Sequence, residues 1–118
     1  MTLKEVAEIL DAEVLTGHEK LEEIEVERVA AADMMSDVLA FSQPRILLIT
    51  GLNTPQVPRT VSIVDGVGAV IVRKHMVPQT TIDLAKALGI PLLHSKFSMF
   101  EACGRLYIRG LKPVESLS

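Results

Sequence analysis

Short apolar runs separated by glycine and proline divide most of the chain into alternating strands and helices. Uninterrupted apolar runs are typical of strands covered on both faces, and they occupy residues 46–49, 69–72 and 92–93. Apolar residues at helical spacing follow the first two runs: Val57, Val61 and Val64, then Ile82, Ala85 and Leu88. The order strand, helix, strand, helix, strand, helix from Ile46 onward predicts an α/β fold with right-handed crossovers and a mainly parallel sheet flanked by helices.

Capping patterns predict where other helices begin. A Ser or Thr followed three residues later by an acidic residue can cap a first turn, and this spacing starts at Thr2, Thr80 and Ser98. The first of these helices is expected over residues 3–10, the second ends at Gly89, and the last runs to about Tyr107. Residues 11–16 tolerate a strand, and the segment 24–30 contains the positions of an edge strand.

Residues 31–41 mix small side chains with two methionines and end in a helical pattern. The methionines are interpreted as core filling. Asp33 and Asp37 can cap this helix or contact a cation, and capping is the commoner use of such residues.

The first apolar run ends at Gly51, where a proline-marked segment begins. Thr54 can cap the following helix with Pro55 at its first position, or Pro58 opens the regular helix after a turn. A strand, a glycine turn and a helix place free backbone N–H groups at the carboxyl end of a sheet, where α/β proteins tend to bind anions and nucleotides. This turn is the candidate ligand site.

The candidate ligand site combines the turn with the cationic residues near it. Side chains that can donate hydrogen bonds, and the charged cluster after the second apolar run, complete the predicted set: Gly51, Asn53, Thr54, Arg59, Arg73 and Lys74. Lys96 can also reach this edge if the third strand is adjacent. The other interpretation is an ordinary strand-to-helix turn in which Thr54 only caps the helix.

The residue types that enzymes and metal sites need are scattered along the chain. His18, His75 and His94 lie far apart and Cys103 is the only cysteine, so neither a zinc site nor an internal disulfide is expected. No lysine follows Gly51, which excludes a kinase-type P-loop, and no nucleophile elbow or dinucleotide fingerprint is present. We therefore expect no catalytic residue, no metal and no cofactor, and an enzyme is the least favoured class.

Composition limits the classes of partner. With 12 Lys and Arg against 15 Asp and Glu the formal charge is −3, and no basic stripe suits a general nucleic-acid binder. The apolar runs are too short to span a bilayer and the first residues lack signal-peptide features, so we expect a cytoplasmic protein without membrane association. The 118 residues fit one domain over residues 1–111, followed by a loose tail over 112–118.

Three stretches resemble the DRTGG domain family: DMMSDVLAF at residues 33–41, LLITGLNTPQVPRT at 47–60, and IPLLHSKFSMFEACGRLY at 90–107. The similarity is strongest to stand-alone members. More distant relatives are the DRTGG segment of some phosphotransacetylases and the amino-terminal domain of HPr kinase/phosphorylase. The family pentapeptide is absent, and residues 51–60 occupy its position. The resemblance implies an α/β accessory or regulatory domain that forms dimers and often accompanies nucleotide-sensing CBS domains, and it does not imply kinase activity.

Two functional hypotheses follow from these patterns. The first is a non-catalytic regulatory domain that senses a nucleotide or another small anion at the carboxyl ends of the strands. The second is a homodimeric interaction module that docks onto a metabolic or redox enzyme assembly and binds no small ligand. Its motivation is a possible apolar contact patch that includes Met34, Met35, Met99 and Phe100.

Overall fold

A six-stranded sheet forms the centre of the computed structural model, which describes residues 1–41, 43–73 and 75–114. In these residues the strand order is β1-β5-β4-β3-β2-β6, and every neighbouring pair is parallel except β1 with β5. The strands are β1 (Glu13–Thr16), β2 (Arg28–Ala31), β3 (Ile46–Thr50), β4 (Gly68–Ile71), β5 (Leu92–His94) and β6 (Lys112–Pro113). The prediction of a mainly parallel α/β sheet is confirmed.

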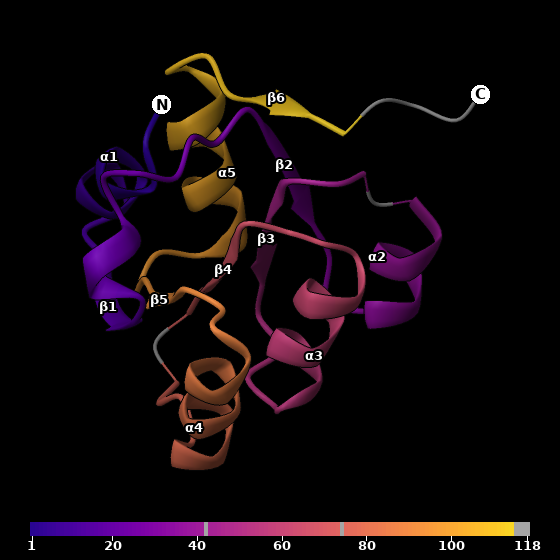
Figure 1. Ribbon diagram of the computed structural model, residues 1–118. Coiled ribbons are helices and arrows are strands. Elements are labelled where there is room, and N and C mark those ends of the chain that lie inside the picture. The colour runs from indigo at the N-terminus through magenta and orange to yellow at the C-terminus, as the bar shows by residue number, and fades with distance from the viewer. Residues whose placement is uncertain (42, 74, 115–118) are drawn as a thin grey trace.

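Helices cover both faces of the sheet, so the fold has three layers (Figure 1). One face carries α2 (Met35–Phe41), α3 (Gln56–Ile63) and α4 (Gln79–Leu88), and the other carries α1 (Leu3–Ile9) and α5 (Met99–Tyr107). A short 3₁₀ turn, η1 (His18–Lys20), follows β1. In the described part of the chain, no helix is long and apolar enough to cross a membrane.

The central strand β3 contributes to both hydrophobic layers. Leu47 and Ile49 share a buried cluster with α1 and α5, whereas Ile46 and Leu48 share one with α2, α3 and α4. All four side chains are fully buried, as the uninterrupted apolar run predicts. Burial of one such side chain stabilises the fold by roughly 1.5–3 kcal/mol, so the carboxyl end of β3 is held firmly in place.

The carboxyl ends of β2, β3, β4 and β5 meet at one edge of the sheet because these strands are parallel. At this carboxyl edge, α4 takes the chain from β4 to one face, and α5 takes it from β5 to the other. In open α/β sheets, a crevice in which ligands bind lies where the helices after two adjacent strands go to opposite faces. The residues at the edge include Asp33, Gly51, Arg73 and His94.

Two predicted capping residues are confirmed. The Thr2 hydroxyl accepts a hydrogen bond from the Glu5 N–H at 3.2 Å, and the Glu5 carboxylate accepts one from the Thr2 N–H at 3.1 Å. This backbone bond, together with the Thr2 hydroxyl, holds the pKa of Glu5 below its usual range. At α5, the Ser98 hydroxyl accepts the Glu101 N–H at 3.2 Å. Gly89 ends α4 in the left-handed conformation, as predicted.

Two predicted helix starts are wrong. α4 begins directly after Pro78 and carries no side-chain cap, so Thr80 lies inside its first turn. α3 begins after Pro55, which occupies the capping position, and therefore neither Pro55 nor Pro58 is the first helical residue. Pro58 is tolerated at the third helical position because the first N–H groups of a helix have no intrahelical partner.

The predicted edge strand and tail also need correction. β2 is not an edge strand, since it pairs with β3 along its whole length and with β6 at its start. Lys112 and Pro113, expected in the loose tail, form β6, and the next N–H, of Val114, donates to Val29 O at 3.2 Å. Residues 115–118 of the expected tail lie outside the described residues.

Candidate functional site

At the carboxyl edge, the side chain of Asp33 is held by donors from two neighbouring loops. The Gly51 N–H donates to Asp33 Oδ1 at 2.7 Å, and Arg73 Nη2 donates to Asp33 Oδ2 at 3.1 Å. Asp33 comes shortly after β2, Gly51 directly after β3, and Arg73 shortly after β4. One carboxylate therefore joins the ends of three adjacent strands.

The backbone of Arg73 is fixed in an unfavourable conformation. Its φ is +81°, a left-handed value that costs a residue with a side chain on the order of 1–2 kcal/mol. The Arg73 N–H donates to Phe97 O at 2.9 Å, and the Nε2–H of His94 donates to Arg73 O at 2.8 Å. Because a carbonyl can only accept, Nε2 must carry the proton of His94. These bonds maintain the backbone that directs Arg73 toward Gly51.

The guanidinium of Arg73 lies directly against Gly51. A Cβ on Gly51 would lie 2.8 Å from Arg73 Cζ, closer than real Cβ atoms come, and 3.0 Å from Arg73 Nε, so the flexible end of the arginine would have to move away. Glycine is therefore required here for close approach of the guanidinium, and its backbone conformation is an ordinary one.

Solvent reaches both partners of the ion pair. The exposed fraction is 47% for the Asp33 side chain and 50% for that of Arg73. An ion pair this exposed contributes about 0–1 kcal/mol to stability, less than the strain at Arg73. The arrangement therefore positions donors more than it stabilises the fold.

Hydrogen bonds also shape the turn between β3 and α3. The Asn53 side-chain amide donates to Met76 O at 3.0 Å, and the Thr81 hydroxyl donates to Asn53 O at 2.7 Å. These bonds join the turn to the segment before α4 and to α4 itself. The Thr54 hydroxyl accepts a long bond, 3.4 Å, from the Gln56 N–H, and the Thr54 carbonyl accepts the Val57 N–H at 3.0 Å.

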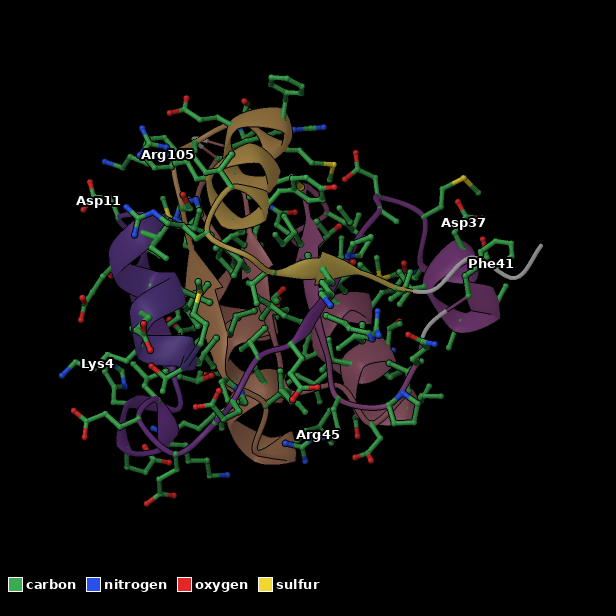
Figure 2. All side chains as sticks on the ribbon, turned by 90° about the horizontal axis from the view of Figure 1, so that it is seen from above. Lys4, Asp11, Asp37, Phe41, Arg45 and Arg105 are labelled. Atoms are coloured by element: carbon green, nitrogen blue, oxygen red, sulfur yellow. The ribbon has the colours of Figure 1, made fainter. Side chains whose placement is uncertain are left out.

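A separate apolar groove with a volume of about 490 Å³ opens at the β2–β6 end of the sheet, between α2 and α5. Besides residues of β2, its lining includes Val38, Phe41, Cys103, Leu106, Tyr107 and Val114, with Asp37 and Lys112 as charged members. Phe41 is 53% exposed and Tyr107 is 69% exposed. Figure 2 shows Asp37 and Phe41 on α2, the helix toward which β6 points. The groove is a candidate contact surface.

Cys103 lies in the wall of this groove and is only partly buried. Burial raises the pKa of its thiol, so the reactive thiolate is scarce near neutral pH. This agrees with its interpretation as a small hydrophobe, although it is not fully enclosed.

Comparison with known families assigns the chain. The model of the DRTGG domain matches residues 5–107, which is most of the sequence. The chain belongs to the DRTGG domain family. The resemblance seen in the three sequence stretches is thereby confirmed. A search of curated proteins finds no match to this DRTGG domain.

A solved structure supports the fold of this DRTGG domain. The chain is similar in fold to a crystal structure of the CBS and DRTGG domains of the regulatory region of Clostridium perfringens pyrophosphatase, in a complex with the activator diadenosine tetraphosphate. The TM-score is 0.75 at 20% sequence identity, and the match covers 94% of this chain. The chain spans 47% of the pyrophosphatase chain, so the likeness concerns the fold of about half of that region.

The structure brings only part of the predicted ligand-binding set together. Gly51 and Arg73 meet at Asp33, while Asn53 and Thr54 of the DRTGG domain use their side chains within the chain. Arg59 is exposed on α3, and in the described residues no hydrogen bond or ion pair joins it to the others. Lys74 lies outside the described residues.

Other residues considered in the sequence are also placed. Lys96 lines a small cavity with Leu10 and Glu13, and in the described residues no hydrogen bond or ion pair joins it to Gly51 or Arg73. In the described part of the chain, no group of three or more His, Cys, Asp or Glu is placed to hold a metal ion. Of the four residues named for an apolar patch, Met35 is buried, Met99 packs against the core, and Met34 and Phe100 are exposed.

Asp33 is the site residue whose role the sequence did not reveal. It was expected to cap a helix or contact a cation, but it accepts from Gly51 and Arg73. The signal that could have found it is its position two residues after β2. Had β2 been placed next to β3, Asp33 would have been expected at the carboxyl edge beside Gly51.

Replacing Gly51 by alanine should move Arg73 away from Asp33, because the new Cβ would collide with the guanidinium. We expect the free energy of unfolding, measured by urea denaturation, to fall by at most about 1 kcal/mol, since the ion pair is exposed. Gly104→Ala in α5 is the matched control, because its Cβ would meet no atom within 4 Å. This control should stabilise the protein by about 0.5–1 kcal/mol. A loss above about 2 kcal/mol in Gly51→Ala would contradict a positioning role and indicate a packing defect.

Proposed function

We propose that this DRTGG domain is a non-catalytic regulatory domain that responds to a nucleotide or another small anion at the carboxyl edge of its sheet. The observation that carries the proposal is the convergence of the Gly51 N–H and the Arg73 guanidinium on one carboxylate. Backbone N–H groups and guanidinium groups are the usual donors to phosphate oxygens. Donors already arranged around an anion need little rearrangement to bind another one.

The solved neighbour supports a regulatory role. It is the regulatory region of an enzyme, and its complex contains the activator diadenosine tetraphosphate together with CBS and DRTGG domains. By analogy, a domain of this fold can work beside a larger enzyme without catalysing a reaction itself. The proposed role here is of the same kind, with the ligand bound through its phosphate oxygens.

The proposed roles of the residues follow their contacts. Gly51 and Arg73 bind the anion, and His94 and Phe97 hold the backbone of Arg73 in position. Asn53 keeps the turn joined to the segment before α4. The side chain of Arg59 supplies positive charge only if a large ligand extends along α3.

A thermal-shift experiment tests this proposal. The ligands are AMP, ATP, diadenosine tetraphosphate and inorganic pyrophosphate, with adenosine as the control that lacks phosphate. A ligand at 100 times its Kd adds about 2.7 kcal/mol to stability, so we expect Tm to rise by several degrees. Arg73→Met should abolish the shift. Arg109→Met is the matched control, since Arg109 is exposed and lines a separate cavity with Arg28, and it should behave as wild type.

Two results would count against the anion site. A flat response to every phosphate compound at millimolar concentration would remove the sensor in this form. An equal shift in wild type and Arg73→Met would place the ligand away from the carboxyl edge.

A second candidate function, a homodimeric interaction module, is favoured by the apolar groove. We propose a second copy of the chain as its occupant, because the groove carries opposite charges on two elements. Asp37 lies on α2 and Lys112 on β6, and in the described residues no ion pair joins them. In a two-fold dimer each residue of one copy can meet the other residue of its partner. The exposed rings of Phe41 and Tyr107 would supply the apolar contact.

Charge exchange tests the dimer by sedimentation equilibrium. Asp37→Lys and Lys112→Asp should each weaken association, because like charges then face each other across the two-fold axis. The double variant should restore most of the wild-type association. Circular dichroism checks that each variant keeps the helix content of the wild type. A monomeric wild-type protein at 100 µM, or a double variant no better than the singles, would contradict this interface.

A further inference from the structure

We propose that Asp33 is an internal competitor of the ligand, and that the ligand group recognised at the carboxyl edge is a phosphate or pyrophosphate oxyanion. This inference rests on the proposed anion site and adds how that site is regulated. The ligand would take the donors that Asp33 now occupies, so binding and release of Asp33 are the same event.

The contacts of Asp33 define the chemistry of the group it would yield to. Its two oxygens each receive one donor, from Gly51 at 2.7 Å and from Arg73 at 3.1 Å. A phosphate presents oxygens at a similar spacing and binds the same two kinds of donor, a backbone N–H and a guanidinium N–H. Gly51 offers only its backbone and has no side chain with which to read a base or a sugar. The recognised group is therefore the oxyanion.

Arg73 has donors to spare for a larger anion. A guanidinium carries five N–H groups. Within the residues that the structure describes, Asp33 receives the one hydrogen bond that the Arg73 side chain donates. The half-exposed position of this side chain leaves the remaining donors open to solvent. These donors can therefore contact further oxygens of a phosphate that has taken the place of Asp33.

Displacement of Asp33 requires little free energy. An ion pair as exposed as this one contributes little to stability, and phosphate carries more negative charge than a carboxylate. The larger negative charge of phosphate is attracted more strongly by these donors, which favours the ligand over the tethered Asp33 side chain. The carboxylate therefore lowers the affinity for the ligand and does not prevent binding.

Release of Asp33 can affect the apolar groove through α2. Asp33 lies between β2 and α2, two residues before Met35 begins that helix. Its bonds to Gly51 and Arg73 hold this short link against the ends of β3 and β4. Phe41, at the other end of α2, lines the groove. Ligand binding should therefore loosen the start of α2 and change the groove wall.

Isothermal titration with inorganic pyrophosphate tests the competition. Asp33→Ala should bind pyrophosphate about tenfold more tightly than wild type, since it removes both the competitor and a negative charge. Asp33→Asn keeps a neutral acceptor for Gly51 and should show a smaller gain. Asp83→Ala, on α4, changes the net charge equally and should bind as wild type. Adding Arg73→Met to Asp33→Ala should remove the gain.

The outcomes separate this inference from the proposed function. If wild type binds pyrophosphate and Asp33→Ala binds no more tightly, Asp33 is not a competitor while the anion site stands. If neither protein binds, both proposals fail. A gain that survives in the double variant, or appears equally in Asp83→Ala, would be a general charge effect and would overturn the inference. Binding seen only in Asp33→Ala and lost with Arg73→Met would support it.

Hydrogen exchange reports the coupling to α2. Saturating pyrophosphate should speed exchange of the amides at residues 34–38 in wild type. The same amides should already exchange fast in Asp33→Ala and respond little to ligand. Unchanged exchange in wild type at saturation would show that Asp33 stays in place, which contradicts displacement.

Discussion

Parallel pairing of β2 through β5 is the constraint on which the rest of the molecule depends. Parallel strands need a crossover between them, and each crossover here is a helix that covers one face of the sheet. The same pairing collects all four carboxyl ends at one edge. Polar residues that follow these strands are therefore neighbours even where they are 40 residues apart, as Asp33 and Arg73 are.

The edge differs physically from the core beneath it. β3 is fully buried and contributes to both hydrophobic layers, while the next residue, Gly51, is reached by a half-exposed arginine. The left-handed backbone of Arg73 adds strain, and a weak ion pair does not repay it. Strained residues of this kind persist where the surrounding structure holds them, and they gather at functional sites. This contrast is the physical reason for placing an anion site at the edge.

The sequence predicted the parts of the fold that local patterns control. The apolar run of β3, the capping box at Thr2 and the left-handed stop at Gly89 were all readable, because each depends on residues close in the chain. The pairing of β2 and β6 was not, since it depends on contacts between residues about 84 positions apart. Strand propensity alone does not show which strand lies at an edge.

The candidate site divides in the same way. Gly51 was identified because a strand, a glycine and a helix follow one another in the sequence. Arg73 was identified by its position after the next strand, and the two do meet. The role of Asp33 stayed hidden because it required the position of β2 in the sheet. The side chain of Arg59, predicted from charge alone, forms no hydrogen bond or ion pair with Gly51, Arg73 or Asp33 in the described residues.

Anion binding at the carboxyl edge is tested most directly by a pyrophosphate titration followed by ¹⁵N NMR, with the Gly51 amide and the Arg73 Nε–H as reporters. If the carboxyl edge binds the anion, both signals shift together and saturate at one Kd, while the Arg109 Nε–H signal stays in place. If pyrophosphate binds but the Gly51 and Arg73 signals do not move, the ligand lies elsewhere and the edge is only a structural contact.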